Sequence, residues 1–347
     1  MSENTLTRRN FIHKATAGLA AGAALGVKQS SAQNVPPPLE KKLPRQVWIA
    51  AISQDGLSAQ NPKSMVLNVA DILKEVSRYH PDIICLPETF AHTNVSDELD
   101  VKKAADELAG LITREMSGFA RENQCYLICP VYTRDGEQVY NSAVVLDREG
   151  DFVGGYHKTH PTESEIEKGI TPGPLDPPVF KTDFGKIGVQ ICFDIQWGLG
   201  WYQLEKTGAD IVFWPSAFAG GRLVNTKAWQ HKYVTVSSTK KDTTKICDIS
   251  GKVIASTNRW HPNFVVAPVN LEKAFLHTWP YVRKFEDIRR KYGRHVSITT
   301  FGEEEFTILE SRHPSIRVAD ILEEYNIKTH REHIESAERA QNRARPG

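Results

Sequence analysis

The stretch GKIGVQICFDIQWGLGWY, Gly185 to Tyr202, is the part of the sequence that decides the fold. Its first half, Lys186 to Ile191, has the apolar, β-branched composition of a short buried strand. Cys192 follows at once, and the residues after it predict a turn that leads into a helix. A helix N-terminus lowers the pKa of a thiol and the thiolate is the reactive form, so Cys192 is a candidate nucleophile. The alternative is a buried core cysteine at a strand end.

The length and composition are those of an ordinary globular protein. The chain has 347 residues, of which 40% are hydrophobic and 24% charged, with room for one large domain or two smaller ones. Its 43 basic and 42 acidic residues give a net charge of +1, so the strongly basic face of a nucleic-acid-binding protein is not expected. The five cysteines are odd in number and irregular in spacing, which argues against a disulfide framework.

Residues 1–32 resemble a bacterial twin-arginine signal peptide. The segment holds, in order, a twin arginine, an apolar run of small residues and a polar end: Arg8 and Arg9, Ala15 to Val27, and Ser30 with Ala32. We expect cleavage after Ala32 and a periplasmic or secreted protein. The alternative is an uncleaved anchor, but the apolar run is short for a membrane span, so no stable membrane anchor is expected. Residues 33–45 are rich in Pro and Lys and predict a linker.

Between residues 46 and 271, buried strands alternate with amphipathic helices and extra strands then pair up. Strands are predicted at 46–53, 81–88, 125–133, 139–146, 151–156, 210–213 and 263–271, with hairpins at 179–192 and 245–256. Helices are predicted at 61–79, 102–122, 197–207 and 225–233. This order predicts a layered α/β sandwich with helices outside. In such folds active residues lie at the carboxyl ends of strands, where Glu88, Lys158 and Cys192 are expected.

The residues around these three side chains resemble the signature regions of the carbon–nitrogen hydrolase (nitrilase) superfamily, in its amidase or carbamoylase-like branch. The motifs are LPETF around Glu88, YHKTHP around Lys158 and GVQICFD around Cys192, supported by TPGP at 171–174. The resemblance covers about residues 46–271. It implies a four-layer αββα sandwich, a homodimer or higher homo-oligomer, a small-molecule substrate and no metal or other cofactor.

The resemblance also implies a Glu-Lys-Cys triad. Cys192 would attack a carbonyl or nitrile carbon and form a thioester-type intermediate, while Glu88 would take the thiol proton and pass it to the leaving nitrogen. Lys158 would stabilise the oxyanion together with the backbone N–H of Phe193. Many members carry a second glutamate after the lysine, and here we favour Glu165 over its neighbours Glu163 and Glu167.

The residues after Cys192 bear on the substrate. Cys-Phe-Asp resembles the amidase and carbamoylase branches, whereas nitrilases more often have Trp-Glu there, so an amide or N-carbamoyl compound is favoured over a nitrile. Many amidases continue with Arg-Phe-Pro-Glu, but this chain has Gln196 and Trp197, which puts a carboxylate-bearing substrate in doubt. Asp194 is interpreted as a structural hydrogen-bonding residue. Phe193, Trp197 and Phe218 are expected to line the substrate pocket.

Two other classes of protein remain as alternatives. A metal-dependent hydrolase would use His157 and His160 on either side of Lys158, with Glu163, but HxxH on a loop is a poor zinc scaffold. His330 and His333 are expected in a polar tail. A binding homologue with an inactive site is the second alternative.

The segment 272–347 is dense in charge. We expect too few apolar residues for an independent core, and an extension that packs on the main domain or on a partner subunit. A helix is predicted at 318–325.

Overall fold

The structure is a computed structural model that describes residues 42–105, 109–260 and 262–346. The predicted signal peptide and most of the predicted linker lie outside these residues. Within the described ranges, no helix combines the length and the apolar character needed to cross a membrane.

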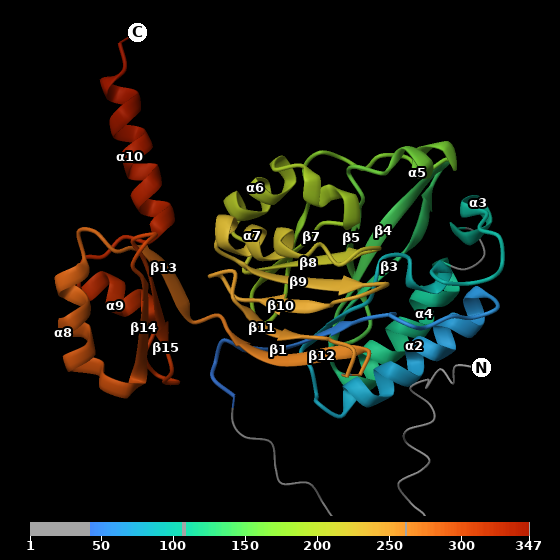
Figure 1. Cartoon of the computed structure of the whole chain (residues 1–347), viewed down its shortest axis with the longest axis horizontal. Coiled ribbons are helices and arrows are strands. Elements are labelled where there is room, and N and C mark those ends of the chain that lie inside the picture. Colours follow the sequence, from blue (N-terminus) through green and yellow to red (C-terminus); the bar gives the residue numbers. More distant parts are fainter. Residues whose placement is uncertain (1–41, 106–108, 261, 347) are drawn as a thin grey trace, which may run out of the picture. The chain divides into compact units, whose positions relative to one another are not determined.

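Two six-stranded sheets form the centre of the molecule (Figure 1). In sheet order the first contains β12 (Phe264–Asn270), β1 (Gln46–Ile52), β2 (Ile83–Cys85), β3 (Tyr126–Asp135), β4 (Gln138–Leu146) and β5 (Phe152–His157). The second contains β11 (Val253–Ser256), β10 (Lys245–Cys247), β9 (Val234–Thr239), β8 (Ile211–Ser216), β7 (Lys186–Val189) and β6 (Val179–Lys181). Each sheet has a parallel centre, β1-β2-β3 in one and β7-β8-β9 in the other, flanked by antiparallel strands. The predicted hairpins β6-β7 and β10-β11 are confirmed.

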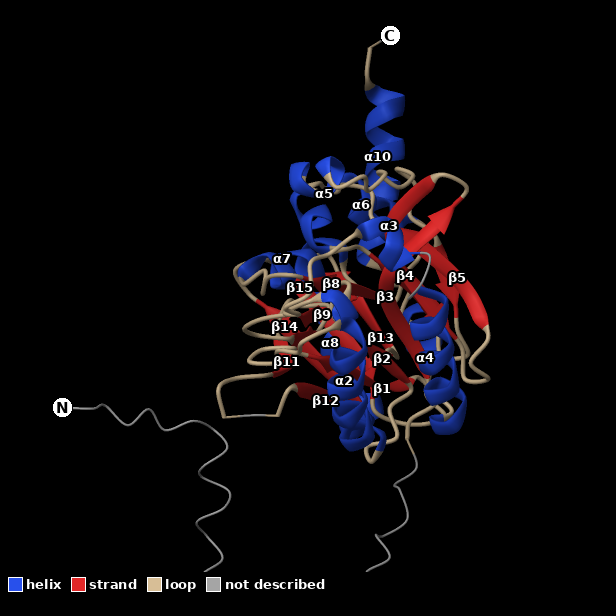
Figure 2. Ribbon diagram, turned by 90° about the vertical axis from the view of Figure 1, so that its right-hand side faces the viewer, coloured by secondary structure: helices blue, strands red, loops and turns tan. Residues whose placement is uncertain are grey.

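The sheets pack face to face and helices cover their outer faces. One apolar cluster joins inward-facing side chains of both sheets, such as Ile49 and Ile83 of the first and Ile187 and Phe213 of the second. On the first sheet lie α2 (Pro62–Ser77) and α4 (Ala109–Asn123), and on the second lie α6 (Leu199–Lys206) and α7 (Arg222–His231) (Figure 2). The predicted four-layer αββα sandwich is therefore confirmed.

The chain segments between strands carry the remaining short helices. These are η1 (Phe90–His92), α3 (Val101–Lys103), α5 (Glu163–Glu167) and η3 (Cys192–Gln196). The helix predicted at 197–207 is confirmed as α6, and the predicted turn before it forms the 3-10 helix η3. Three of these connections, which contain η1, α5 and η3, carry the residues that the sequence singled out.

The carboxyl ends of strands from both sheets are tied together. Ser238 of β9 donates a hydrogen bond through its hydroxyl to the carbonyl of Ile52 (2.7 Å) and approaches the carbonyl of Cys85 (2.9 Å), the last residues of β1 and β2. Because Glu88 follows β2 and Cys192 follows β7, this contact fixes the two sheet ends from which the candidate site is built.

The segment after the sandwich has a core of its own, so the expectation of too few apolar residues there is wrong. It contains β13 (Lys273–His277), α8 (Val282–Tyr292), η4 (Gly293–His295), β14 (Val296–Phe301), β15 (Phe306–Ser311), α9 (Val318–Glu324) and α10 (His330–Ala344). Leu276, Phe285, Ile288, Leu309 and Ile321 belong to one buried cluster. The few apolar residues suffice because strands and helices direct them to one shared face. The predicted helix at 318–325 is confirmed as α9, whereas α10 was not predicted.

Candidate active site

A buried lysine joins two glutamates at the carboxyl end of the first sheet. Lys158 directly follows β5, and its Nζ lies 2.8 Å from Oε1 of Glu88 and 2.9 and 2.7 Å from Oε1 and Oε2 of Glu165. The lysine side chain is 1% exposed, that of Glu88 7% and that of Glu165 19%. Charges so buried persist only when they are paired, and this ammonium is paired twice.

Local sequence explains which glutamate reaches the lysine. Thr162 caps α5 and exchanges hydrogen bonds with Glu165: the Thr162 backbone N–H donates to Oε2 (2.8 Å), and the Glu165 N–H donates to the threonine hydroxyl (3.3 Å). This capping box turns Glu165 inward. Glu163 and Glu167 of the same helix are exposed. The structure thus brings Glu165 to Lys158, and not its two neighbours.

The turn after Lys158 is held by the TPGP segment. The N–H of Gly173 donates to the carbonyl of Lys158 (2.8 Å). A Cβ at Gly173 would lie 2.3 Å from the carbonyl oxygen of His157, so this close approach requires glycine.

Cys192 starts η3 in a left-handed backbone conformation, with φ +46°. Its carbonyl accepts a hydrogen bond from Nε1 of Trp214 (2.9 Å), a fully buried residue of β8. Thr89, next to Glu88, is likewise left-handed, with φ +43°. Non-glycine residues in this region are strained by about 1–3 kcal/mol, and such strain concentrates at functional sites.

The thiol of Cys192 is not acidified in the resting protein. Burial and the charge of Glu88 raise its pKa to about 12, because Lys158 and the hydrogen bonds from the Ala217 N–H and the Ser216 side chain lower it by less. The expectation that a helix N-terminus activates this thiol is therefore wrong. η3 has only five residues, and the effects that raise the pKa of this thiol, burial and the charge of Glu88, outweigh those that lower it.

The charges of the lysine and of Glu165 stabilise each other. Burial lowers the pKa of Lys158, but Glu88, Cys192 and Glu165 outweigh it and the net shift is upward. Burial raises the pKa of Glu165, and Lys158 outweighs that effect, so the net shift is downward. At neutral pH the centre thus holds a charged lysine and a neutral thiol, and deprotonation of Cys192 needs a base.

Asp194 links the nucleophile turn to the lysine loop. Its fully buried carboxylate accepts hydrogen bonds from the Tyr156 hydroxyl (2.7 Å), the Ile191 N–H (2.8 Å) and the His160 N–H (2.8 Å), and contacts Nδ1 of His160 (3.0 Å). This geometry agrees with a structural hydrogen-bonding role for Asp194. His160 faces this carboxylate, while Nδ1 of His157 lies 2.7 Å from the hydroxyl of Ser142. Among the described residues, no group of His, Cys, Asp and Glu side chains has the geometry of a metal site.

Of the aromatic side chains expected in the substrate pocket, Phe193 and Trp197 belong to the turn that begins at Cys192, and Phe218 packs against Trp214. Trp197 is 40% exposed and stacks on His160, with ring centroids 4.0 Å apart. Phe193 packs edge-on against Trp197 (5.0 Å) and Phe218 edge-on against Trp214 (5.2 Å). Of these three side chains, that of Trp197 is the exposed one, and Trp197 lies a few residues after Cys192 in the chain.

Two residues at this centre were missed by sequence reasoning. Asn141 of β4 donates hydrogen bonds from Nδ2 to Glu88 and Glu165, and Ser216 ends β8 beside Cys192. The available signal was a polar residue within an apolar strand, as in VYNSAVVL and IVFWPS.

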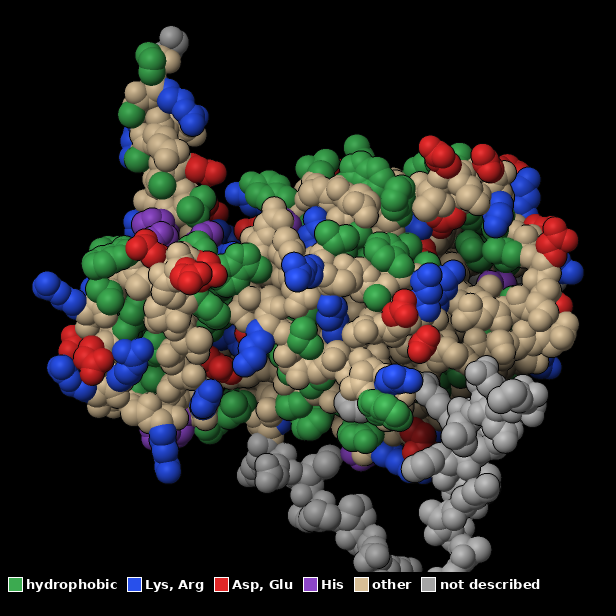
Figure 3. Space-filling view, viewed as in Figure 1, with side chains coloured by type: hydrophobic (Ala, Val, Ile, Leu, Met, Phe, Trp, Pro, Cys, Tyr) green, Lys and Arg blue, Asp and Glu red, His purple; other side chains and the backbone are tan. Residues whose placement is uncertain are grey.

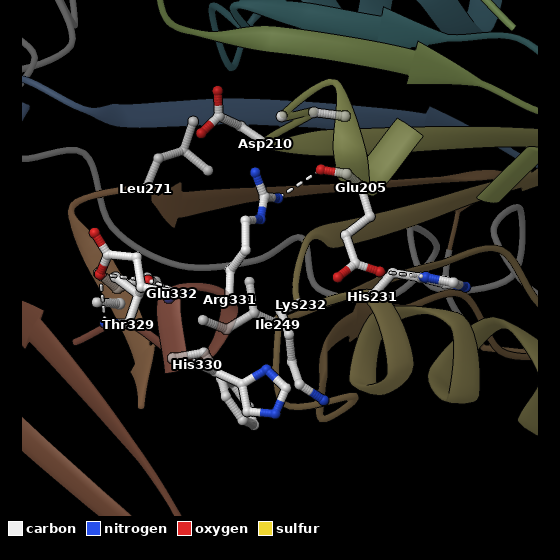
Figure 4. Close-up of a pocket in the computed structure, with 15 residues that line it drawn as sticks. Glu205, Asp210, His231, Lys232, Ile249, Leu271, Thr329, His330, Arg331 and Glu332 are labelled. Atoms are coloured by element: carbon white, nitrogen blue, oxygen red, sulfur yellow. Dashed lines mark hydrogen bonds and ion pairs between the residues drawn. The ribbon is translucent and has the colours of Figure 1, made fainter. Parts of the chain in front are cut away.

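A separate cavity of about 430 Å³ lies at the other end of the second sheet (Figure 4). Asp210 and Lys232 line it at the start of β8 and β9, whereas the carboxyl end of β8 lies beside Cys192. Arg331 of α10 reaches across it and donates to the carbonyl of Glu205 (2.5 Å). His330 packs edge-on against Phe275 and Phe306, and burial lowers its pKa to about 4, so it does not lie in a solvated tail.

The four-layer sandwich is the fold of the nitrilase superfamily, as two solved structures show. The chain resembles the crystal structure of an amidase from Nesterenkonia sp. (TM-score 0.58, 17% identity, 71% of this chain and 96% of that one). It also resembles a carbon–nitrogen hydrolase from Helicobacter pylori G27 (TM-score 0.59, 16% identity, 72% and 94%). At these identities the likeness concerns the fold.

The profile of the Carbon-nitrogen hydrolase family matches residues 49–275, and the chain belongs to this family. It is 31% identical over 147 residues to a beta-ureidopropionase of Arabidopsis thaliana (40% of this chain, 36% of that protein). It is 31% identical over 172 residues to a nitrilase of Pyrococcus abyssi (48% and 65%) and 28% identical over 176 residues to a deaminated glutathione amidase of Bos taurus (46% and 52%). The matched segments thus span between 36% and 65% of these relatives.

Proposed function

We propose that the protein hydrolyses a carbon–nitrogen bond in a small amide or N-carbamoyl compound through a thioester formed on Cys192. The observation that carries this proposal is the buried contact of Lys158 with Glu88 and Glu165 next to a neutral thiol. Such a centre supplies a base, a fixed positive charge and a nucleophile within one water-excluded site.

The proposed reaction has two halves, acylation of Cys192 and hydrolysis of the thioester, and in each half Glu88 accepts one proton and then gives it back. Glu88 takes the Sγ proton while sulfur attacks the carbonyl carbon, and Lys158 stabilises the oxyanion together with the Phe193 N–H. The C–N bond then breaks, and Glu88 returns the proton to the leaving nitrogen, which departs as ammonia or amine. Water attacks the thioester, again with Glu88 as base, and releases the carboxylic or carbamic acid and the thiol.

Glu165 is proposed as the second glutamate, which holds Lys158 and faces the site. Trp197, Phe193 and Phe218 are proposed to contact the substrate. Trp197 stands where many amidases carry Phe and follows Gln196 in place of Arg, so an uncharged or weakly polar acyl group fits better than a carboxylate-bearing one. No metal or other cofactor enters the proposed steps.

A nitrile is the second candidate substrate, because the relatives include a protein described as a nitrilase. Hydrolysis of a nitrile would release ammonia through the same thiol. An inactive binding homologue is the third candidate. Ammonia release from a panel of amides, N-carbamoyl compounds and nitriles separates the three, with Cys192→Ala as the inactive control. Ammonia from nitriles alone would overturn the proposed substrate class, and turnover by Cys192→Ala would overturn the mechanism.

We also propose that the protein is exported by the twin-arginine pathway. The proposal rests on Arg8 and Arg9 and on the small-residue run that follows them. Replacement of both arginines by lysine should retain the protein in the cytoplasmic fraction, which cell fractionation and immunoblotting would detect.

We also propose that the protein is a homo-oligomer, because apolar side chains are exposed on the helices that cover the outer face of the second sheet. Leu199 and Tyr202 of α6 and Leu223 of α7 are 51%, 46% and 41% exposed, and Figure 3 shows hydrophobic side chains at the surface over α6. A second copy that covered these side chains would remove apolar surface from water. Sedimentation velocity of the wild type and of Tyr202→Glu tests this: a wild-type monomer would contradict it.

A further inference from the structure

Asn141 contacts both glutamates of the candidate site at once. Its Nδ2 donates one hydrogen bond to Oε1 of Glu88 (2.9 Å) and one to Oε1 of Glu165 (2.8 Å). The orientation of the amide follows from its neighbours, because only the NH₂ group can face two carboxylates. The backbone is fixed as well, since the carbonyl of Asn141 accepts the N–H of Lys158 (2.8 Å).

The other half of this amide has no partner. Oδ1 of Asn141 is buried and accepts no hydrogen bond from any residue that the structure describes, and the whole residue is 1% exposed. An unpaired buried acceptor costs about 1–3 kcal/mol. Stability therefore does not explain an asparagine here, and its contribution must come from the two hydrogen bonds that it donates.

The electrostatics of the centre show what these hydrogen bonds do. Two carboxylates share one ammonium, so the three groups carry a net negative charge in the interior. Among the described residues, Glu88 also acts on the ionisable groups of Tyr132 of β3 and Cys192, and both are neutral because burial and Glu88 raise their pKa values. Like charges that share a site oppose each other's ionisation. Asn141 places one N–H on each carboxylate and so opposes this repulsion.

We propose that Asn141 is a positioning residue that keeps Glu88 and Glu165 charged and oriented around Lys158, so that Glu88 can accept the proton of Cys192 at neutral pH. In that step the S–H bond breaks, its electron pair stays on sulfur, and the proton forms an O–H bond with the carboxylate of Glu88. The inference rests on the proposed function, but this step precedes substrate chemistry and can be measured without a substrate.

The test measures alkylation of Cys192 by iodoacetamide against pH, with the modified site identified by mass spectrometry. Asn141→Leu has a similar volume and removes both donors and the unpaired acceptor, while Asn141→Asp keeps the shape and adds a third carboxylate. The acid limb is the low-pH part of the profile, where the alkylation rate rises with pH. In both variants this limb should shift to higher pH by about one unit, so that the rate at a given pH on the limb falls about tenfold. Thermal unfolding checks that each variant is folded.

Asn270→Asp is the matched control. The Nδ2 of Asn270 also donates to a glutamate, Glu310 (2.9 Å), but on β12 and outside the candidate site. The profile of this variant should coincide with that of the wild type.

A second background makes the test specific. Glu165→Gln removes one of the two negative charges, so its acid limb should lie below that of the wild type, and adding Asn141→Leu should then move it much less. This arm applies even if Asn141→Leu or Asn141→Asp fails to fold alone, since Glu165→Gln by itself must shift the limb downward. Two results would overturn the proposal. One is that Asn141→Leu lowers the alkylation rate equally at every pH, both in the wild type and in Glu165→Gln. The other is that the acid limb of Glu165→Gln coincides with that of the wild type. Failure of the proposed function would instead appear as a wild type without turnover in which the alkylation limb still responds to Asn141.

Discussion

Replacement of Lys158 by methionine should destabilise the protein in a pH-dependent way. The methionine keeps most of the volume of the lysine and removes an ammonium that is 1% exposed and lies within 2.9 Å of three carboxylate oxygens. Breaking a buried ion pair by removal of one partner costs about 3–5 kcal/mol, because the other charge stays buried without compensation. We expect a deficit of that size in the free energy of unfolding at pH 7 and above.

The pH dependence follows from Glu165. In the wild type Lys158 outweighs burial and holds the pKa of Glu165 below its ordinary 4.5, so this carboxylate stabilises the fold above pH 4.5 and loses that effect as the pH falls through its lowered pKa. Without the ammonium, burial raises the pKa of Glu165 instead. In the variant, the contribution of Glu165 to the free energy of unfolding is therefore present below pH 4.5 and is lost as the pH rises through the raised pKa of this carboxyl group. The deficit of the variant should therefore shrink steadily from pH 8 to pH 5.

Urea unfolding of both proteins between pH 5 and pH 8 measures this deficit, provided that the m-values agree. Lys273→Met is the control: Lys273 is 10% exposed and pairs closely with one carboxylate, that of Asp248 (2.8 Å), so its deficit should be smaller. A deficit for Lys158→Met below about 1 kcal/mol, as for an exposed pair, or one that stays constant across the pH range, would refute this account of the buried pairs.

Three further results are expected. Asp194→Asn should lower the free energy of unfolding by at least about 2 kcal/mol, because the carboxylate accepts several hydrogen bonds in the interior, and a variant as stable as the wild type in urea would contradict its structural role. Ile321→Ala in the C-terminal cluster should cost about 2–5 kcal/mol, whereas Ile334→Ala, at a position 42% exposed on α10, should cost less than about 0.5 kcal/mol by the same measurement. Treatment with a chelator should leave turnover unchanged, and a loss restored by a divalent metal would favour the metal-dependent alternative.

The sandwich could be predicted from sequence because its signals are local. Runs such as Ile83–Cys85 and Ile211–Ser216 are apolar on both faces, as strands buried between a second sheet and a helix must be. The ends of such strands mark where polar side chains can emerge: Glu88 follows Ile83–Cys85, and Cys192 follows the strand Lys186–Val189. In the C-terminal segment the apolar residues are sparse, and their convergence on one cluster depends on how β13, β15 and α8 fold against each other.

The residues of the candidate site also differ in whether a local sequence signal or only the folded structure identifies them. The resemblance alone leaves Glu163 and Glu167 as alternatives to Glu165, but a local signal separates them, since Thr162 and Glu165 have the spacing of the capping box that the structure shows. Asn141 has no such signal, because its partners Glu88 and Glu165 lie 53 and 24 residues away in the chain. A polar residue within an apolar strand indicates a buried polar contact but does not identify the partner.

The state of Cys192 could be inferred only after the site was assembled. A strand followed by a helix predicts an activated thiol, but the structure encloses this thiol beside Glu88, and burial with that charge raises its pKa to about 12. A neutral resting thiol is less exposed to oxidation and alkylation than a free thiolate would be. It also makes the proton transfer to Glu88 part of the reaction, so the contacts of Glu88 with Lys158 and Asn141, more than the position of the cysteine at a helix start, should determine the reactivity of this centre.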